Sequence, residues 1–407
     1  MWPALTQAGT VYSIVPSAQA ITKQMNRRQF SQQIGAGAAI AAGATVVMKP
    51  VRAADVATPK RSEKKEWARE HFKGLGGLIM PTFTPDFKSL DEEGVRIDVR
   101  HAIQQGFSSA TVSANGANAE QTKRMWEIVR EETAGSKTGM GALGGDLAFL
   151  DSIGCSYTMV SFPRNAKPQT EDEVYATFRK TIDSTRMAVV LYGSPVEVLK
   201  RFDPSGIPIN VFDKLADHPN VVGMKLTHPM NPVTAFELCE RLSDRLILGP
   251  CNFEHIPLLA KHYRNIQWSG LWITDSLQSP EKPYGVEMMD LVNKGRMADA
   301  LKVYWRMQPL VQGIYDLQAP LLLHEGHPWA HMKYLQWVTG GNGGLLPLKE
   351  GPYLPKLTPE GRESIQTNFK KAGIAPVDRP DEEFMVGKAA YAKGVRASQL
   401  SSQPLYT

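Results

Sequence analysis

Short apolar runs alternate with helix-length amphipathic segments along most of the chain. Eight of these runs are predicted as strands: 78–83, 109–114, 139–145, 157–160, 187–192, 221–226, 245–249 and 269–274. Runs that are apolar throughout are typical of parallel strands buried on both faces, and the intervening lengths fit covering helices. Eight β/α alternations predict an α/β fold, a (β/α)8 TIM barrel, in preference to an open sheet.

The segments between the apolar runs carry helical periodicity. A helix over 91–106 places Val95, Val99 and Ala102 on one side and ends at Gly106. Further helices are predicted at 118–132, 147–153 and 171–185 between the strands, and at 284–318 and 358–372 beyond them, with a loop over 340–355. Residues after about 378 show little apolar periodicity and are predicted to form a tail.

The first part of the chain has the pattern of an export signal. The segment Asn26–Ser31 contains two consecutive arginines, an Ala/Gly-rich run follows over 34–48, and a small-residue cleavage site lies near Ala54. This order resembles a twin-arginine signal, which implies the twin-arginine (Tat) export machinery as a partner and a periplasmic or secreted location. The apolar run has about 15 residues, fewer than the ~20 that span a bilayer, which favours export over an anchor. Translation from Met1 or from Met25 remains open.

These patterns divide the chain into five parts. They are the signal with its N-terminal extension (1–53), a linker (54–73), the barrel (74–295), a C-terminal helical extension (296–375) and a tail (376–407). The chain has 407 residues, which suits one barrel of roughly 250 residues plus additions.

The composition is that of an ordinary globular protein. Hydrophobic residues make up 42% and charged residues 21%, and the net charge is +5 without long runs of one sign. Nucleic acid and anionic membrane are therefore not expected partners. Cys155, Cys239 and Cys251 form no C-x-x-C pair. Buried thiols are expected, with one disulfide as the alternative.

Two residues at strand ends can carry covalent chemistry. The carboxyl ends of the strands point into the active-site mouth of such a barrel. Lys225 is the only cation in an otherwise apolar strand, and burial favours the neutral amine, which can attack a carbonyl to form an imine. Tyr192 ends the preceding strand, and its phenol could relay protons beside such an imine. An ammonium that reaches solvent and a tyrosine with a satisfied hydroxyl are the alternatives.

A loop of small residues is the candidate carboxylate site. Gly116, Ala117 and Asn118 lead into a helix, where backbone N–H groups attract anions. An ordinary turn with Asn118 as the N-cap is the alternative. Thr274, at the end of the last predicted strand, is a further candidate for substrate contact.

Five segments in order resemble the dihydrodipicolinate synthase/N-acetylneuraminate lyase family of Schiff-base aldolases, over about 74–373. They are Pro81–Pro85, Gly116–Glu120 (Gly-Thr-Thr-Gly-Glu in the family), Pro163–Pro168 (Pro-Tyr-Tyr-Asn-Lys-Pro), Leu191–Pro195 (Tyr-Asn-x-Pro) and Val222–Lys225. The resemblance implies a homotetrameric barrel in which Lys225 forms the imine with a 2-oxo acid such as pyruvate. It also implies that Tyr192 relays protons and that Gly116–Asn118 holds the carboxylate. No metal or organic cofactor is expected.

Departures from the family pattern narrow the activity. Ala117-Asn118 replaces two threonines, Arg164-Asn165 replaces the tyrosine pair, and Val196-Glu197 replaces Gly-Arg. These changes, and export, argue against the diaminopimelate-pathway synthase. The expected function is an exported lyase or aldolase that cleaves or forms a C–C bond next to a 2-oxo acid, hydratase-aldolase chemistry included.

Two other functions remain open. The barrel could bind a small carboxylate or sugar acid without turnover, because fold does not fix function. A metal-dependent hydrolase could use His324, His327 and His331, although Pro328 would break a helix that aligned them, which favours a structural role.

Trp268 and Trp272, at the last strand, could line an apolar pocket. Packing inside the barrel or against its helices is the favoured alternative for both.

Overall fold

The computed structural model describes residues 63–407 except 164, 228–231, 271–273 and 323–325. The chain divides into two units, Met1–Lys60 and Arg61–Thr407. The first unit lies outside the described residues, and so does the predicted export signal with its cleavage site.

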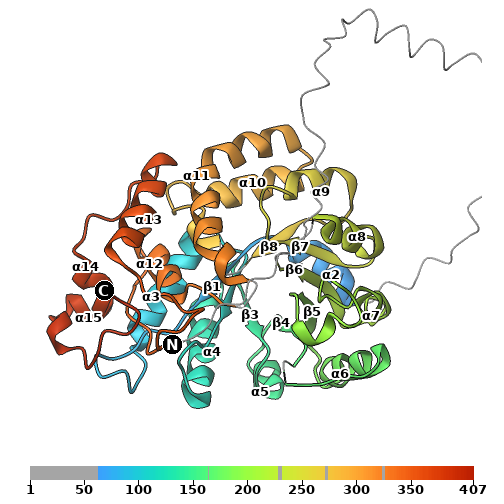
Figure 1. The fold of residues 1–407 in the computed structure, drawn as a ribbon, viewed down its shortest axis with the longest axis horizontal. Helices are drawn as coiled ribbons and strands as arrows, with labels where there is room; N and C mark the ends of the chain where they lie inside the picture. Colours follow the sequence, from blue (N-terminus) through green and yellow to red (C-terminus); the bar gives the residue numbers. More distant parts are fainter. Residues whose placement is uncertain (1–62, 164, 228–231, 271–273, 323–325) are drawn as a thin grey trace, which may run out of the picture. The chain divides into compact units, whose positions relative to one another are not determined.

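Eight parallel strands form one sheet in the order β7-β6-β5-β4-β3-β2-β1-β8, and β7 packs against β8 to close it (Figure 1). Their bounds are β1 Gly74–Ile79, β2 Ser109–Val112, β3 Gly139–Leu143, β4 Tyr157–Val160, β5 Ala188–Gly193, β6 Val221–Leu226, β7 Ile247–Pro250 and β8 Trp268–Gly270. The predicted (β/α)8 barrel is confirmed. Nearly every strand position is buried, because helices cover the outer face and side chains fill the interior.

Helices follow the strands in alternation. Around the barrel they are α3 Glu92–Gln104, α4 Ala119–Thr133, α5 Leu147–Ser152, α6 Glu171–Asp183, α7 Ile209–Leu215, α8 Pro232–Leu242, α9 Ile256–His262 and α10 Tyr284–Asn293. The 3-10 turns η1 Glu197–Leu199 and η2 Thr274–Ser276 follow β5 and β8. Asp91 and Thr170 cap α3 and α6, since their side chains accept from the backbone N–H of Gly94 and Glu173.

The C-terminal extension packs on one side of the barrel (Figure 1). It contains α11 Met297–Leu322, α12 Trp329–Val338, α13 Pro359–Lys371, α14 Asp381–Val386, α15 Lys388–Ala392 and the 3-10 turn η3 Ala397–Gln399. The predicted single helix over 284–318 is wrong, because the chain breaks between α10 and α11. Gly295 adopts a φ of 73° there, which ends α10 and allows a new helix to begin.

Two strand predictions are displaced. The first strand begins at Gly74 rather than Leu78, because its glycine-rich start pairs with β8 and β2 although glycine contributes no apolar side chain. Pro81 lacks the N–H needed to continue the ladder, so residues 80–83 leave the sheet. The last strand is described over Trp268–Gly270, residues 271–273 lie outside the described part of the chain, and Thr274 lies in η2.

The predicted linker contains a helix that covers the amino-terminal end of the barrel. This helix, α2 Glu63–His71, ends just before Phe72, whose ring stacks on Trp268 at the start of β8 with centroids 4.5 Å apart. The side-chain amide of Gln267 donates to the carbonyls of Ala68, Arg69 and Phe72. Part of the predicted linker therefore belongs to the folded barrel.

The predicted tail is also folded. Phe384 is fully buried and Leu405 nearly so, and the N–H of Leu345 donates to Met385 O while that of Leu357 donates to Leu405 O. The two helices here, α14 and α15, have 6 and 5 residues. Elements this short show no detectable helical period, which is why the sequence pattern missed them.

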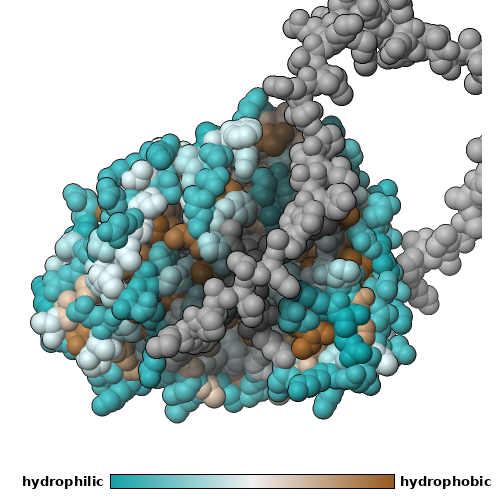
Figure 2. All heavy atoms as spheres, viewed as in Figure 1, coloured by the Kyte–Doolittle hydropathy of each residue, from teal (hydrophilic) through white to brown (hydrophobic). Residues whose placement is uncertain are grey.

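The surface and core follow the composition. In the view of Figure 2 the described residues are mainly hydrophilic with scattered apolar side chains. Cys155, Cys239 and Cys251 are free and buried, as predicted. Among the described residues, no helix has both the length and the apolar character to cross a membrane.

Candidate active site

Lys225 and Tyr192 come together on neighbouring strands. They are Cα partners in the β5–β6 ladder, and Lys225 Nζ lies 4.8 Å from the centre of the Tyr192 ring. The lysine is fully buried, and its Nζ has no hydrogen-bond partner among the described residues. The amine therefore lies in a buried site with the face of a phenol ring as its neighbour.

Strand register places a thiol beside this lysine. Lys225 pairs with Gly249 on β7, and side chains alternate along a strand, so Cys251 faces the same side as Gly249. Gly249 faces the interior, since a Cβ there would lie 2.2 Å from Trp268 Cε3. Burial raises the pKa of Cys251, an effect that Lys225 and Thr227 partly offset. The lysine thus has a neutral thiol for a neighbour.

The candidate carboxylate loop is already hydrogen-bonded internally. The N–H of Ala117 donates to Ala114 O at 2.9 Å. Asn118 caps α4: its side chain accepts from Gln121 N–H, and Gln121 Oε1 accepts from Asn118 N–H, both at 2.9 Å. The expectation that the N–H groups of Ala117 and Asn118 are free is therefore wrong, and the turn with an N-cap is confirmed. A carboxylate that binds the N–H of Asn118 would have to displace the Gln121 side-chain amide. Gly116, the first residue of the candidate site, belongs to the same loop.

Thr274 has a structural hydrogen bond. Its side chain is fully buried, and its hydroxyl donates to Gly76 O of β1 at 2.9 Å. This bond ties η2 to the first strand. The substrate contact predicted for Thr274 gains no support from this geometry.

Trp268 belongs to the core rather than to a pocket. It is fully buried and packs between Phe72 and Gly249 inside the barrel. The packing alternative is confirmed for Trp268, while Trp272 lies outside the described residues.

The histidines of the extension that the structure describes have different surroundings. His331 lies buried on α12, and burial lowers its pKa to about 4. His327 stacks on Trp329 with ring centroids 4.9 Å apart, and His324 lies outside the described residues. Within the described part of the chain, no three His, Cys, Asp or Glu side chains are grouped to hold a metal ion. The geometry fits the structural role for His327 and His331.

A polar cluster at the end of β7 was not anticipated from the sequence. Tyr315, on α11, donates its hydroxyl to Glu254, with oxygen–oxygen distances of 2.7 and 2.8 Å. Asn252 Nδ2 contacts both, at 3.1 Å from Glu254 Oε1 and 3.0 Å from the Tyr315 hydroxyl. Burial and the Glu254 charge raise the pKa of Tyr315. The sequence contains no pattern that predicts a contact between Glu254 and Tyr315, because the two residues are far apart in the chain.

A buried charged network joins the C-terminal extension to the barrel. Lys333, on α12, pairs with Asp98 of α3 at 2.6 Å and donates to Thr82 Oγ1 at 3.0 Å. Burial also raises the pKa of Asp275 to about 7. The charge of Asp98 raises this pKa further, whereas a hydrogen bond with Gln336 lowers it. This network fixes α12 to the barrel.

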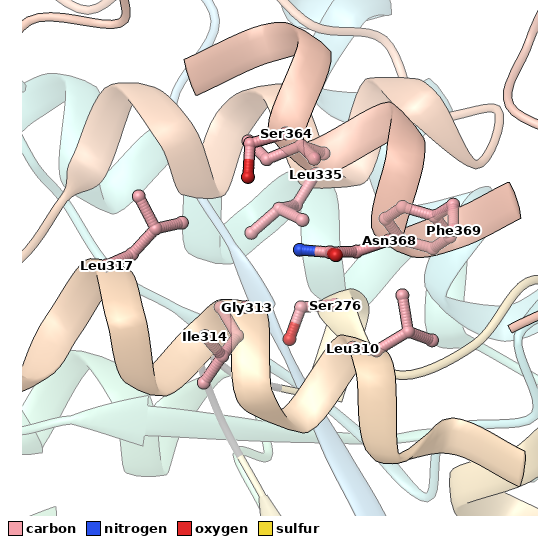
Figure 3. A pocket seen from close by; sticks show the side chains of 10 residues that line it. Ser276, Leu310, Gly313, Ile314, Leu317, Leu335, Ser364, Asn368 and Phe369 are labelled. Atoms are coloured by element: carbon pink, nitrogen blue, oxygen red, sulfur yellow. The ribbon is translucent and has the colours of Figure 1, made fainter. Parts of the chain in front are cut away.

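The cavity in Figure 3 is too small for a substrate. It lies among α11, α12, α13 and η2, where Ser276 and Asn368 are polar and most of its other lining residues are apolar, and its volume is about 20 Å³. One water needs roughly 10–15 Å³, so this space suits a single water.

Fold and lysine together define a (β/α)8 barrel with a buried lysine near the carboxyl end of β6. No family model matches the chain. It is 20% identical over 316 residues to 4-hydroxy-tetrahydrodipicolinate synthase of Methanopyrus kandleri, covering 74% of this chain and 96% of that protein. It is 26% identical over 166 residues to an uncharacterized DapA-like lyase of Pyrobaculum arsenaticum, covering 37% of this chain and 53% of that protein.

Solved structures share the fold. N-acetylneuraminate lyase from Fusobacterium nucleatum matches with a TM-score of 0.57 at 16% identity, covering 74% of this chain and 98% of that one. Dihydrodipicolinate synthase from Aquifex aeolicus matches with a TM-score of 0.59 at 16% identity, covering 76% and 100%. These TM-scores show that the chain shares the barrel fold of both proteins.

Proposed function

We propose that this chain is a Schiff-base lyase or aldolase of the dihydrodipicolinate synthase/N-acetylneuraminate lyase family, acting on a 2-oxo acid. The observation that carries the proposal is the buried Lys225 amine, unpartnered among the described residues, against the ring of Tyr192. Such an amine is nucleophilic, and a phenol at its side can move protons.

The reaction follows from these two groups. Lys225 Nζ attacks the carbonyl carbon of the oxo acid, and the carbonyl oxygen leaves as water once it has been protonated. The resulting protonated imine accepts the electron pair of the C–C bond that breaks, which releases an aldehyde and leaves an enamine on Lys225. Tyr192 gives a proton to the oxygen that leaves as water, and it gives or takes the proton at the enamine carbon that becomes the methyl group of pyruvate. The reverse sequence forms the C–C bond.

The departures from the family pattern set limits to the substrate. Glu197 lies in η1, where its carboxylate pairs with Lys200 at 2.6 Å, and the matching position in the synthases carries a cation. A substrate with a second carboxylate at this position is disfavoured by the charge. Lyase or hydratase-aldolase chemistry therefore suits this site better than diaminopimelate-pathway synthesis.

Location and assembly are part of the proposal. The twin-arginine motif over Asn26–Ser31 supports export to the periplasm or beyond through the Tat machinery. The family resemblance supports a homotetramer. Fractionation with a tagged full-length chain tests the first, and light scattering of the purified chain tests the second.

Borohydride trapping tests the chemistry. The purified full-length chain is incubated with pyruvate and other 2-oxo acids, reduced, and mapped by peptide mass, with Lys225→Ala as the control. The expected result is a covalent adduct on Lys225 that the variant lacks. A folded chain that forms no adduct with any oxo acid would exclude the imine mechanism.

A binding barrel without turnover is the second candidate. Ala117-Asn118 and Arg164-Asn165 replace threonine and tyrosine pairs of the resembled family, and the loss of these hydroxyl groups from a retained barrel motivates this candidate. Saturable binding of pyruvate or a sugar acid by calorimetry, without any trapped adduct, would establish this function instead.

A further inference from the structure

A second phenol lies in the cluster that follows β7, and β7 borders the strand of Lys225 on the side away from β5. Tyr315 comes from α11 in the C-terminal extension, and its hydroxyl is held at the end of β7 by both carboxylate oxygens of Glu254. Asn252 Nδ2 fixes the pair by donating to Glu254 Oε1 and to the phenolic oxygen. Two distances of 2.7 and 2.8 Å are typical of a strong, charge-assisted bond, so the hydroxyl orientation is well defined.

Cys251 connects this cluster to the lysine. Its N–H donates to the carbonyl of Leu226, the residue after Lys225, at 3.1 Å. Its thiol is close enough to Lys225 and to Tyr315 for electrostatic interaction with both. Strand order therefore places Tyr192 of β5 on one side of Lys225, and Cys251 with Tyr315 on the β7 side.

Unsatisfied polar atoms mark the same region. Lys225 Nζ and Asn252 Oδ1 are both buried without a hydrogen-bond partner among the described residues. Buried polar atoms are normally paired, and each exception needs an explanation. A ligand that reaches from the lysine to Asn252 and donates a hydrogen bond there would satisfy both sites.

The hydrogen-bond directions define what Tyr315 can do. Its own proton points at Glu254 and one oxygen lone pair accepts from Asn252 Nδ2, which leaves the second lone pair for a hydroxyl of the ligand. As Tyr315 takes a proton from that hydroxyl, it can pass its own proton to Glu254, and no phenolate forms beside the carboxylate. Such a relay acts as a base in cleavage and as an acid in the reverse direction.

We propose that Tyr315, backed by Glu254, is the catalytic base for the hydroxyl on the aldehyde half of the substrate, while Tyr192 serves the imine. The inference rests on the proposed Schiff-base function. In cleavage the substrate O–H bond breaks, its proton moves to Tyr315, and the Tyr315 proton moves to Glu254. The O–H electron pair forms the C=O of the released aldehyde, and the C–C electron pair moves into the imine to give the enamine. Glu254 and Asn252 are positioning residues that act through Tyr315.

This division of labour compensates for a departure of the chain. Asn165 occupies a position where the resembled family has a tyrosine. In synthases of the resembled family a phenol of this tyrosine pair joins the proton relay from a neighbouring subunit, and a phenol from the chain's own extension would take over that proton transfer. The substrate class that fits is a 2-oxo acid with a hydroxyl on the carbon that becomes the aldehyde.

The test separates imine formation from aldehyde chemistry. The full-length wild type, Tyr315→Phe and Glu254→Gln are compared, with Tyr304→Phe as the matched control. Tyr304 lies on the same face of α11, about three turns before Tyr315. Burial is the main cause that raises the pKa of Tyr304, and the Glu254 charge raises it further. Pyruvate alone reports imine formation by borohydride trapping and enamine formation by exchange of its methyl protons in D₂O. Pyruvate with glyceraldehyde or benzaldehyde reports condensation by NMR.

The expected result is a split between the two readouts. Tyr315→Phe keeps trapping and methyl exchange within about twofold, while condensation falls by about 10²–10⁴-fold. Glu254→Gln lowers condensation in the same direction while trapping and methyl exchange stay within about twofold, a split that a merely structural role would not produce. Tyr304→Phe behaves as wild type.

Three outcomes overturn the proposal. They are wild-type condensation by Tyr315→Phe, an equal loss of trapping and condensation in that variant, and a wild type that traps pyruvate but condenses neither aldehyde. A wild type that traps no oxo acid instead removes the Schiff-base function on which the inference rests, so the two failures are distinguishable.

Discussion

Asp98 and Lys333 form a fully buried ion pair, with Nζ 2.6 Å from the carboxylate, between α3 of the barrel and α12 of the extension. Asp98 also accepts the N–H of Asn342 at 2.7 Å, and Lys333 donates to Thr82. The pair joins three segments that are far apart in the sequence. It therefore fixes the extension that carries Tyr315 relative to the barrel that carries Lys225.

Breaking this pair should be more damaging than replacing it. Lys333→Met leaves Asp98 buried without its cation and should lower the free energy of unfolding by about 3–5 kcal/mol. The double variant Lys333→Met/Asp98→Leu removes both charges and should recover part of that loss. Urea unfolding of the two single variants and the double variant gives the coupling energy. Equal, additive losses would show that the pair does not act as a unit.

Stability should fall as pH rises through the titration of Asp275. Burial is the main cause that raises its pKa from 3.8 to about 7, so the folded chain keeps this carboxyl protonated where the unfolded chain has ionised it. The penalty appears from about pH 4, grows until about pH 7 and is constant above that, and its size is on the order of a few kcal/mol.

Asp275→Asn is the test, because an amide can donate to Gln336 Oε1, which has no partner among the described residues. The variant should be more stable than wild type at pH 8, and the difference should shrink toward pH 4. Thermal unfolding across this range measures it. A difference that does not change with pH would contradict the assignment.

Removing the Tyr192 hydroxyl should slow catalysis without abolishing the imine. Tyr192→Phe keeps the ring that lies 4.8 Å from Lys225 Nζ, so the adduct should still form on Lys225. Turnover should fall by about 10²–10⁴-fold, the usual contribution of general acid–base catalysis. Trapping yield and steady-state rate are measured on the same preparation. Unchanged turnover would assign the proton transfers elsewhere.

The wild-type Gln121 side chain should weaken the binding of 2-oxo acids, because it competes with their carboxylate for the N–H of Asn118. Its amide occupies the Asn118 N–H and is itself held by donation to Lys88 O at 2.8 Å. Gln121→Ala frees the N–H and should tighten pyruvate binding by up to about tenfold, since such a hydrogen bond contributes about 1–1.5 kcal/mol. Pyruvate concentration curves of the trapping reaction measure the change, with Gln169→Ala as a surface control. Unaltered or weaker binding would place the carboxylate away from this loop.

The helix α2 should be required for barrel stability. Phe72→Ala removes the ring stacked on Trp268 and should cost about 3–5 kcal/mol. Trp67→Ala, on the same helix and only partly buried, should cost less and serves as the control. Denaturant midpoints of the two variants test this. A larger loss for Trp67→Ala would mean that α2 is held by its outer face.

The sequence alone was sufficient for the architecture, and it predicts that Lys225 and Tyr192 are the two central side chains of the site. Uniformly apolar runs are buried on both faces whatever their neighbours, so eight of them with helices between fix a parallel barrel. Lys225 was identified because a cation in such a run is exceptional, and Tyr192 because it ends the adjacent run. Both inferences depend on local order along the chain, and the register of β5 and β6 places the two residues together.

Only the tertiary structure decided which of the other polar groups are free. The sequence predicts that the N–H of Asn118 and the hydroxyl of Thr274 are available to a substrate. In the structure the N–H of Asn118 donates to Gln121 Oε1, and the Thr274 hydroxyl donates to Gly76 O. Hydrogen-bond capacity is consumed by partners that no local pattern names. Glu254 meets Tyr315, and Asp98 meets Lys333, only because the C-terminal extension packs on the barrel. Contacts across such separations depend on packing, which the periodicity of a single segment does not encode.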